Sequence, residues 1–194
     1  MRRSFVVLFD YLSRATFFPS EHHIATDDMA KNILGHHPWE FAHPNHVDVI
    51  KESFARCLET GTPDFHVAMM DPEDPIVSFP GQRCCCWLTP VNAPHACGTP
   101  CVAVMAKCVL VPQLFLDLTV RQRELLGLIA EGTSPNDIAE QWGITRTAVD
   151  THLSRIRSTL DLADLLQVAV WATTYRDILD TEVVAKIATS MKVK

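Results

Sequence analysis

The stretch GITRTAVDTHLSRIR, residues 143 to 157, predicts a turn followed by an amphipathic helix. Val149, Leu153, Ile156 and, just beyond the stretch, Leu160 are spaced by four, three and four residues, which places their side chains on one helix face. The opposite face is polar and carries arginines, but it also carries one acidic residue, Asp150. A helix with this charge pattern raises the question of whether it binds a polyanion.

Three more helices are predicted around this one. Residues 118 to 132 begin with Thr119 as a cap, and residues 134 to 143 begin with Ser134 as a cap and Pro135 at the first helical position. A fourth helix is predicted over residues 164 to 179. Two helices joined by a tight glycine-containing turn, the second of them longer and richer in arginine, form a helix-turn-helix.

The N-terminal half has a different composition. Residues 61 to 101 are rich in proline and glycine, and strands are predicted at residues 64–70, 83–89 and 101–111. Joined by turns, these strands would pair as an antiparallel sheet. An amphipathic helix precedes them, with Asn45 expected as its cap and Gly61 just past its end.

The predicted fold class is therefore α+β: an N-terminal antiparallel sheet with helices, then an all-α domain of four helices. We expect the first domain to span residues 1–110, a linker residues 111–117 and the helical domain residues 118–179. The tail, residues 180–194, has apolar residues at helical spacing and is the candidate for one more helix.

The 194 residues carry a formal net charge of −6, which argues against coating nucleic acid by bulk electrostatics, so any DNA contact must be local. The apolar run Phe5 to Phe9 is too short for a signal-peptide core, and no stretch approaches the roughly 18 apolar residues of a membrane span. Seven cysteines, an odd number, favour reduced thiols. We therefore expect a cytoplasmic protein that does not contact membranes.

Residues 118 to 172 resemble the LuxR-type helix-turn-helix domain that also ends the FixJ and NarL response regulators. The matching features are Leu118-Thr119, Arg121 with Glu124, Glu131-Gly132, Ile138-Ala139, Gly143-Ile144, Val149, His152, Ile156 and Leu160. The resemblance implies a transcriptional regulator that binds a double-stranded DNA operator in a sequence-specific manner. It also implies a homodimer on inverted half-sites, with a two-fold seam formed by Leu166, Val170, Trp171 and Thr174.

Recognition helices place their N-terminal side chains against base edges while flanking groups contact phosphate. The residues expected to contact DNA are Ser134, Thr145, Arg146, Thr147, Asp150, Thr151, Ser154, Arg155 and Arg157. Family members usually carry Lys or Arg at position 150, so we expect weak but selective binding. Asp150 either accepts a hydrogen bond from cytosine N4 or pairs with Arg146 four residues earlier.

Residues 14 to 110 resemble a PAS domain, through a Leu-Gly, a His-Pro, a long helix, a glycine turn and an outer strand between residues 33 and 71. Trp87 stands at the usual aromatic position of the following strand. The resemblance implies a five-stranded antiparallel sheet around a pocket capped by short helices, in a domain that senses a signal or dimerises. The resemblance does not specify the ligand of this domain, and both a small molecule and haem remain as alternatives.

Five histidines are candidate axial ligands of haem iron, although exposed positions or a role in the fold's own turn are the stronger interpretation for most of them. They are His36, His37, His43, His46 and His66.

The cysteines also suggest a metal site, but we predict none. Cys84 and Cys86 face one side of a strand and Cys85 the other, so these three cannot converge on one ion. A site built from His95, Cys97, Cys101 and one strand thiol matches no standard zinc spacing, and buried cysteines acting as small hydrophobes are favoured.

No nucleophile–base pair, phosphate loop or paired carboxylates indicate an enzyme. The sequence thus predicts a regulator whose PAS-like domain senses a signal or dimerises and controls the spacing of two recognition helices. The alternative is a protein-interaction module that keeps the LuxR-type fold and binds DNA weakly or not at all.

Overall fold

The computed structural model describes residues 4–10, 14–17, 33–73, 81–94 and 100–190. These residues form two compact units. One contains the described residues up to Val111 together with those from Lys186 onward, and the other spans Pro112–Ala185. No helix in the described ranges combines the length and apolar composition that crossing a membrane requires.

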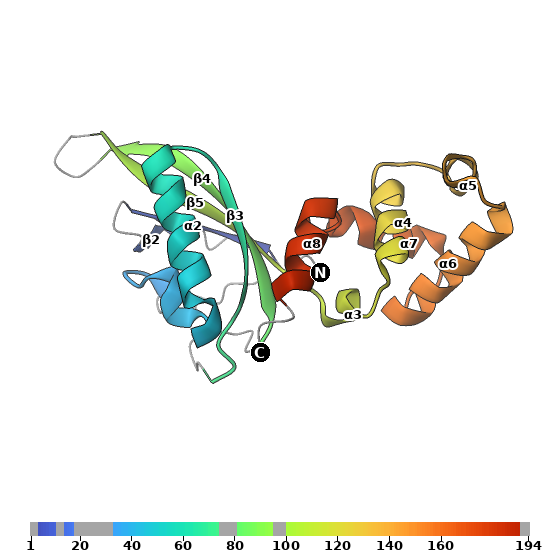
Figure 1. The fold of residues 1–194 in the computed structure, drawn as a ribbon, viewed down its shortest axis with the longest axis horizontal. Coiled ribbons are helices and arrows are strands. Elements are labelled where there is room, and N and C mark those ends of the chain that lie inside the picture. Colours follow the sequence, from blue (N-terminus) through green and yellow to red (C-terminus); the bar gives the residue numbers. More distant parts are fainter. Residues whose placement is uncertain (1–3, 11–13, 18–32, 74–80, 95–99, 191–194) are drawn as a thin grey trace. The chain divides into compact units, whose positions relative to one another are not determined.

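The first unit is built on an antiparallel sheet of five strands in the order β2-β1-β5-β4-β3 (Figure 1). The strands are β1 (Ser4–Phe9), β2 (Ala15–Phe17), β3 (Asp64–Met69), β4 (Arg83–Pro94) and β5 (Pro100–Leu110). The N-terminal strand β1 pairs with β5, the last strand of the unit, so strands from the two ends of this segment lie side by side in the sheet. This arrangement confirms the α+β class and the five-stranded sheet that the PAS resemblance implied.

Helix α2 (Val47–Thr60) packs its apolar face on the sheet. Ile50, Phe54 and Cys57 are buried there, and the ring of Phe54 meets that of Phe9 edge-to-face at 5.0 Å. Gly61 ends the helix with a φ of 64°, a conformation that glycine adopts without steric cost.

The helix begins later than the sequence predicts. Asn45 is not its cap but lies in the 3₁₀ turn η2 (Pro44–His46), which follows the 3₁₀ turn η1 (Pro38–Phe41). His43 caps η2 instead, because its Nδ1 accepts a hydrogen bond from the Asn45 backbone N–H at 3.3 Å. Proline at the first position of each turn favours these short helices, so the chain reaches α2 through two 3₁₀ turns.

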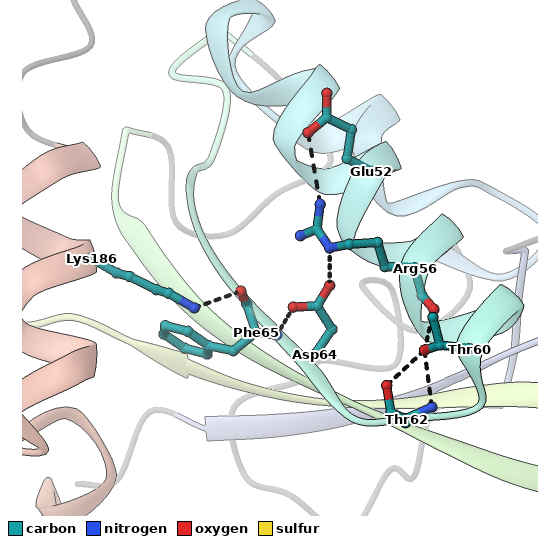
Figure 2. Close-up of polar contacts among 7 residues, drawn as sticks. All are labelled: Glu52, Arg56, Thr60, Thr62, Asp64, Phe65 and Lys186. Carbon is teal, nitrogen blue, oxygen red and sulfur yellow. Dashed lines mark hydrogen bonds and ion pairs between the residues drawn. The ribbon is translucent and has the colours of Figure 1, made fainter.

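Polar contacts fix the connection from α2 to β3, as Figure 2 shows. Arg56 Nε donates to Asp64 at 2.8 Å, and the Thr60 hydroxyl donates to the Arg56 carbonyl at 2.7 Å. From the last part of the chain, Lys186 Nζ donates to the carbonyl of Phe65 at 3.5 Å and lies 4.8 Å from the centre of its ring. These contacts anchor the edge strand β3 within the first unit.

The second unit is helical. Its elements are α3 (Gln113–Leu116), α4 (Val120–Ala130), α5 (Pro135–Trp142), α6 (Arg146–Leu160), α7 (Leu165–Thr174), η3 (Arg176–Ile178) and the start of α8 (Thr181–Ser190). The fourth helix of the predicted domain ends at Thr174 rather than at residue 179, and η3 replaces its last turn. Leu125, Ile138, Val149, Ile156 and Val168 are fully buried and form the centre of the unit.

Residues 111 to 117, expected to be a linker, contain α3 and belong to the packed structure. Phe115 is fully buried, and the carbonyls of Phe115 and Leu116 accept hydrogen bonds from the Arg123 guanidinium at 3.3 and 3.0 Å. Burial lowers the pKa of Arg123, and these carbonyls partly replace the water it has lost. The sequence missed this contact because it joins residues eight positions apart across a turn.

Candidate nucleic-acid interface

Two capped helices define the geometry of the candidate interface. Ser134 caps α5 by accepting from the Asp137 N–H at 3.3 Å, and Thr145 caps α6 by accepting from the Ala148 N–H at 3.2 Å. Between them Gly143 has a φ of 63°, the left-handed conformation that reverses the chain within a few residues. The predicted helix-turn-helix is therefore present, with Ser134 as the cap that the sequence predicts. The sequence predicts Thr145 only as a DNA contact, and the structure shows that it caps α6.

All nine residues expected to contact DNA are exposed. They do not have the same roles, because the side-chain oxygens of Ser134 and Thr145 already accept backbone hydrogen bonds. These two residues hold the N-termini of α5 and α6, whose free N–H groups and positive dipole ends suit an anion.

Arg146 is held from two sides at the start of α6. Its Nη1 donates to Asn136 Oδ1 at 2.8 Å, and its Nη2 lies 3.0 Å from Asp150 Oδ1. Of the two interpretations of Asp150, the ion pair with Arg146 is thus the one present in the structure. Sequence reasoning missed Asn136, because a contact between α5 and α6 depends on how the turn folds.

The remaining polar residues of α6 divide along its length. The Thr151 hydroxyl donates to the Thr147 carbonyl at 2.9 Å, whereas Ser154 and Arg155 lie exposed on the following turn. Arg157 donates to the carbonyls of Leu162 and Ala163, so it fastens the chain after α6. Its position places it with the C-terminal end of the helix and not with the group around Arg146.

The contacts of the arginines leave less positive charge free on α6 than a count of its charges suggests. Arg146, Arg155 and Arg157 against Asp150 give the helix a formal charge of +2. One arginine is paired with the carboxylate and another binds carbonyls. Among the described residues, the Arg155 side chain is the one of the three with no ion pair or hydrogen bond. An exposed ion pair is weak, so a phosphate can compete for Arg146.

The expected dimer seam lies on α7. Leu166 and Val170 are 71% and 59% exposed, an open apolar pair one turn apart. Trp171 is half-buried, with its ring 4.6 Å from that of Tyr175, and the Thr174 hydroxyl donates to the Val170 carbonyl at 2.7 Å. The structure therefore leaves two of the four residues available for a partner and covers the other two in part.

The first unit holds a cavity of about 70 Å³ between the sheet, α2 and η1. Pockets for cofactor-sized ligands are typically roughly 300–1,000 Å³, so this cavity suits something smaller than haem. Its polar lining comes from one histidine and three thiols, those of His66, Cys84, Cys86 and Cys108.

The other four histidine candidates do not line this cavity. His36 pairs with Glu40 at 2.7 Å, and His37 stacks on Trp39 at 4.4 Å. His43 caps η2 and His46 is buried beside it. His95 and Cys97, for which the sequence predicts no metal site, lie outside the described residues.

The fold and the site define a helix-turn-helix domain carried on the same chain as a PAS-like unit. Residues 116–172 match the model of the luxR family of bacterial regulatory proteins, which confirms the LuxR-type domain. The chain is 47% identical over 55 residues to the transcriptional regulatory protein LiaR of Bacillus subtilis, covering 28% of this chain and 26% of LiaR. It is 42% identical over 60 residues to the response regulator protein VraR of Staphylococcus aureus, covering 31% and 29%. The chain thus spans about a quarter of the length of these curated relatives.

Solved structures with some likeness include the PAS-B domain of Drosophila melanogaster Cycle, at a TM-score of 0.44 and 14% identity over 55% of this chain and 99% of that chain. A second is Vibrio cholerae VqmA in complex with ligand and DNA, at a TM-score of 0.39 and 15% identity over 88% and 82%. Both TM-scores lie below 0.5. The PAS-like assignment rests instead on the chain's own strand order.

Proposed function

We propose that this protein is a cytoplasmic transcriptional regulator that binds a double-stranded DNA operator through the N-terminal half of α6. The observation that carries the proposal is the exposed polar face that begins at the capped N-terminus of α6. There Asn136 and Asp150 hold the Arg146 guanidinium over the first turn of the helix. An arginine held in one orientation suits directed contact with a base edge or a phosphate better than a freely rotating one.

The same geometry supports weak but selective binding. To use its full charge on a phosphate, Arg146 must loosen its pair with Asp150, and that loss offsets part of the gain. Near a cytosine, the Asp150 carboxylate can itself accept a hydrogen bond from N4. Together, these two effects weaken binding to arbitrary DNA sequences more than binding to a matching operator.

We further propose that the protein acts as a homodimer through α7 and that the PAS-like unit responds to a small signal. The exposed Leu166 and Val170 support the first part, because two weak half-sites bind far more tightly when they are joined. The cavity between the sheet, α2 and η1 supports the second.

Selection of bound sites from random DNA, followed by anisotropy titration at several salt concentrations, tests the proposal. A selected sequence should bind more tightly than a scrambled one, with the logarithm of affinity falling linearly against the logarithm of salt concentration. Arg146→Ala should weaken binding to the selected sequence, and Arg176→Ala, on an exposed arginine of η3, should leave it unchanged. Absence of binding at every salt concentration would favour the protein-interaction module instead.

A further inference from the structure

A row of histidine and cysteine side chains crosses three neighbouring strands of the sheet. In the strand register, His66 of β3 is paired with Cys86 of β4, and Cys86 is paired with Cys108 of β5. Directly paired residues of antiparallel strands lie on the same face. Cys84, two residues before Cys86, shares that face as well.

The three thiols lie close enough to share one ion. The Sγ atoms of Cys86 and Cys108 are 3.3 Å apart, those of Cys84 and Cys86 are 3.6 Å apart, and all three lie within 4.8 Å of one another. In a tetrahedral zinc site with Zn–S bonds of about 2.3 Å, the sulfur atoms are about 3.8 Å apart. The observed spacing is close to this value without any change of strand register.

His66 gives an independent indication of a missing ligand. Its side chain is 4% exposed and lines the same cavity as the thiols, and its Nδ1 has no hydrogen-bond partner among the described residues. Buried polar atoms nearly always have a partner, so the orphaned Nδ1 of His66, a residue that lines the same cavity as the three thiols, requires an explanation.

The thiolate is the form of cysteine that binds a metal. Thiolates and imidazole together select soft or borderline cations over magnesium and calcium.

We propose that Cys84, Cys86, Cys108 and His66 form a zinc site of the Cys₃His type inside the PAS-like unit. On binding, the three thiols release their protons to solvent, and the neutral imidazole completes the tetrahedron with one ring nitrogen. The ion would tie together the three strands β3, β4 and β5. The site is independent of the DNA contacts proposed for α6.

A disulfide between Cys86 and Cys108 is the competing interpretation. It requires the sulfur atoms to approach from 3.3 Å to about 2.05 Å and an oxidant to take up two electrons. It also leaves Cys84 and the Nδ1 atom of His66 without a role. The zinc site uses all four residues and needs no oxidant, so the geometry favours it.

Titration of the metal-free, full-length protein with Co²⁺ under anaerobic, reducing conditions tests the proposal, because tetrahedral thiolate-bound cobalt has intense charge-transfer and d–d bands. One equivalent should saturate these bands, and Zn²⁺ should displace the cobalt. Cys86→Ser and Cys108→Ser should each weaken binding at least tenfold, and His66→Gln should shift the bands. Zinc should also raise the Tm of the parent protein but not that of Cys86→Ser.

Matched controls separate this site from other thiols. Cys85→Ser, on the opposite face of β4, and Cys57→Ser, in α2, should leave the cobalt spectrum unchanged. The double variant Cys97→Ser/Cys101→Ser should also bind as the parent does. If Cys86→Ser fails to fold by circular dichroism, Cys86→Ala and Cys108→Ser supply the same comparison. No stoichiometric binding by the parent, binding that depends on Cys97 and Cys101, or formation of only a Cys86–Cys108 disulfide would overturn the proposal.

Discussion

Arg146 and Asp150 form an ion pair of 3.0 Å on the first turns of α6, the part of the helix expected to enter the major groove. The pair offsets the positive charge of Arg146 on this surface. Replacing Asp150 with Lys should therefore raise affinity for most DNA sequences by roughly tenfold, equivalent to about 1.4 kcal/mol. The salt dependence of binding should steepen by about 0.9 in the log–log slope for one added phosphate contact. Anisotropy titrations at several salt concentrations measure both quantities.

Two comparisons make this prediction specific. Asp150→Asn should give part of the gain, because it releases Arg146 without adding a charge. Asp161→Asn removes the same charge at the other end of α6, where residue 161 has a φ of 54° that asparagine tolerates. An equal gain from Asp161→Asn would mean that net charge, rather than the pair, sets the affinity.

Thr145 and Thr147 should separate stability from DNA contact. Thr145→Ala removes the cap of α6 and should lower the free energy of unfolding by about 1 kcal/mol. Thr147→Ala removes an exposed side chain two residues later and should change stability by less than about 0.5 kcal/mol. It should nevertheless weaken binding to the selected operator. Urea unfolding and anisotropy measured on the same samples decide between these roles. A larger stability loss in Thr147→Ala than in Thr145→Ala would contradict the cap assignment, and unchanged binding in Thr147→Ala would contradict the contact.

Leu166 and Val170 should determine dimer formation. Leu166→Glu and Val170→Glu each place a charge on the exposed apolar pair of α7 and should weaken the dimer at least tenfold. Sedimentation equilibrium over a range of protein concentrations measures the change, and operator affinity should fall with it.

Val120→Glu supplies the control for that experiment. Val120 is 62% exposed in the first turn of α4, where an acidic residue is compatible with the helix dipole. This variant should dimerise as the parent protein does. A parent protein that is monomeric at every concentration would remove α7 as the seam.

His46 should make the stability of the first unit depend on pH. Burial is the main cause that lowers its pKa from 6.5, and the neighbouring His43, Arg83 and His66 act in the same direction. The unfolded chain therefore binds this proton at a higher pH than the folded chain. The stabilisation is present above about pH 6.5 and is lost as pH falls towards the folded pKa.

Urea unfolding at pH 7.5 and 5.5, followed by tryptophan fluorescence, measures this loss. The interval stays above the range in which Glu40 titrates, because hydrogen bonds from His36 and His37 lower the pKa of that carboxyl from 4.5. His46→Gln should reduce the difference between the two pH values, whereas His37→Gln, on a half-buried ring at the surface, should leave it. A difference that survives in His46→Gln would assign the effect to another group.

Some of this molecule could be predicted because the signals are local. Thr119 and Ser134 stand where the sequence predicts two helices to begin, and the three- and four-residue spacing of Val149, Leu153 and Ile156 identifies the buried face of α6. Each of these features depends on residues within one or two turns. Asn45 shows the limit of such signals, because two prolines divert the chain into 3₁₀ turns before the helix can start.

The sequence by itself determined the helix-turn-helix and the polar face of α6, since these follow from periodicity and capping along one segment. Tertiary structure alone decided that Asn136 binds Arg146, because the turn at Gly143 sets the distance between α5 and α6. The pair of Arg146 with Asp150 lies within α6 and was one of the two alternatives that the sequence offered. Tertiary structure likewise decided that Cys86 of β4 is paired with Cys108 of β5 on one side and with His66 of β3 on the other. The pairing of strands far apart in the sequence depends on the packing of the whole sheet, which no local pattern encodes.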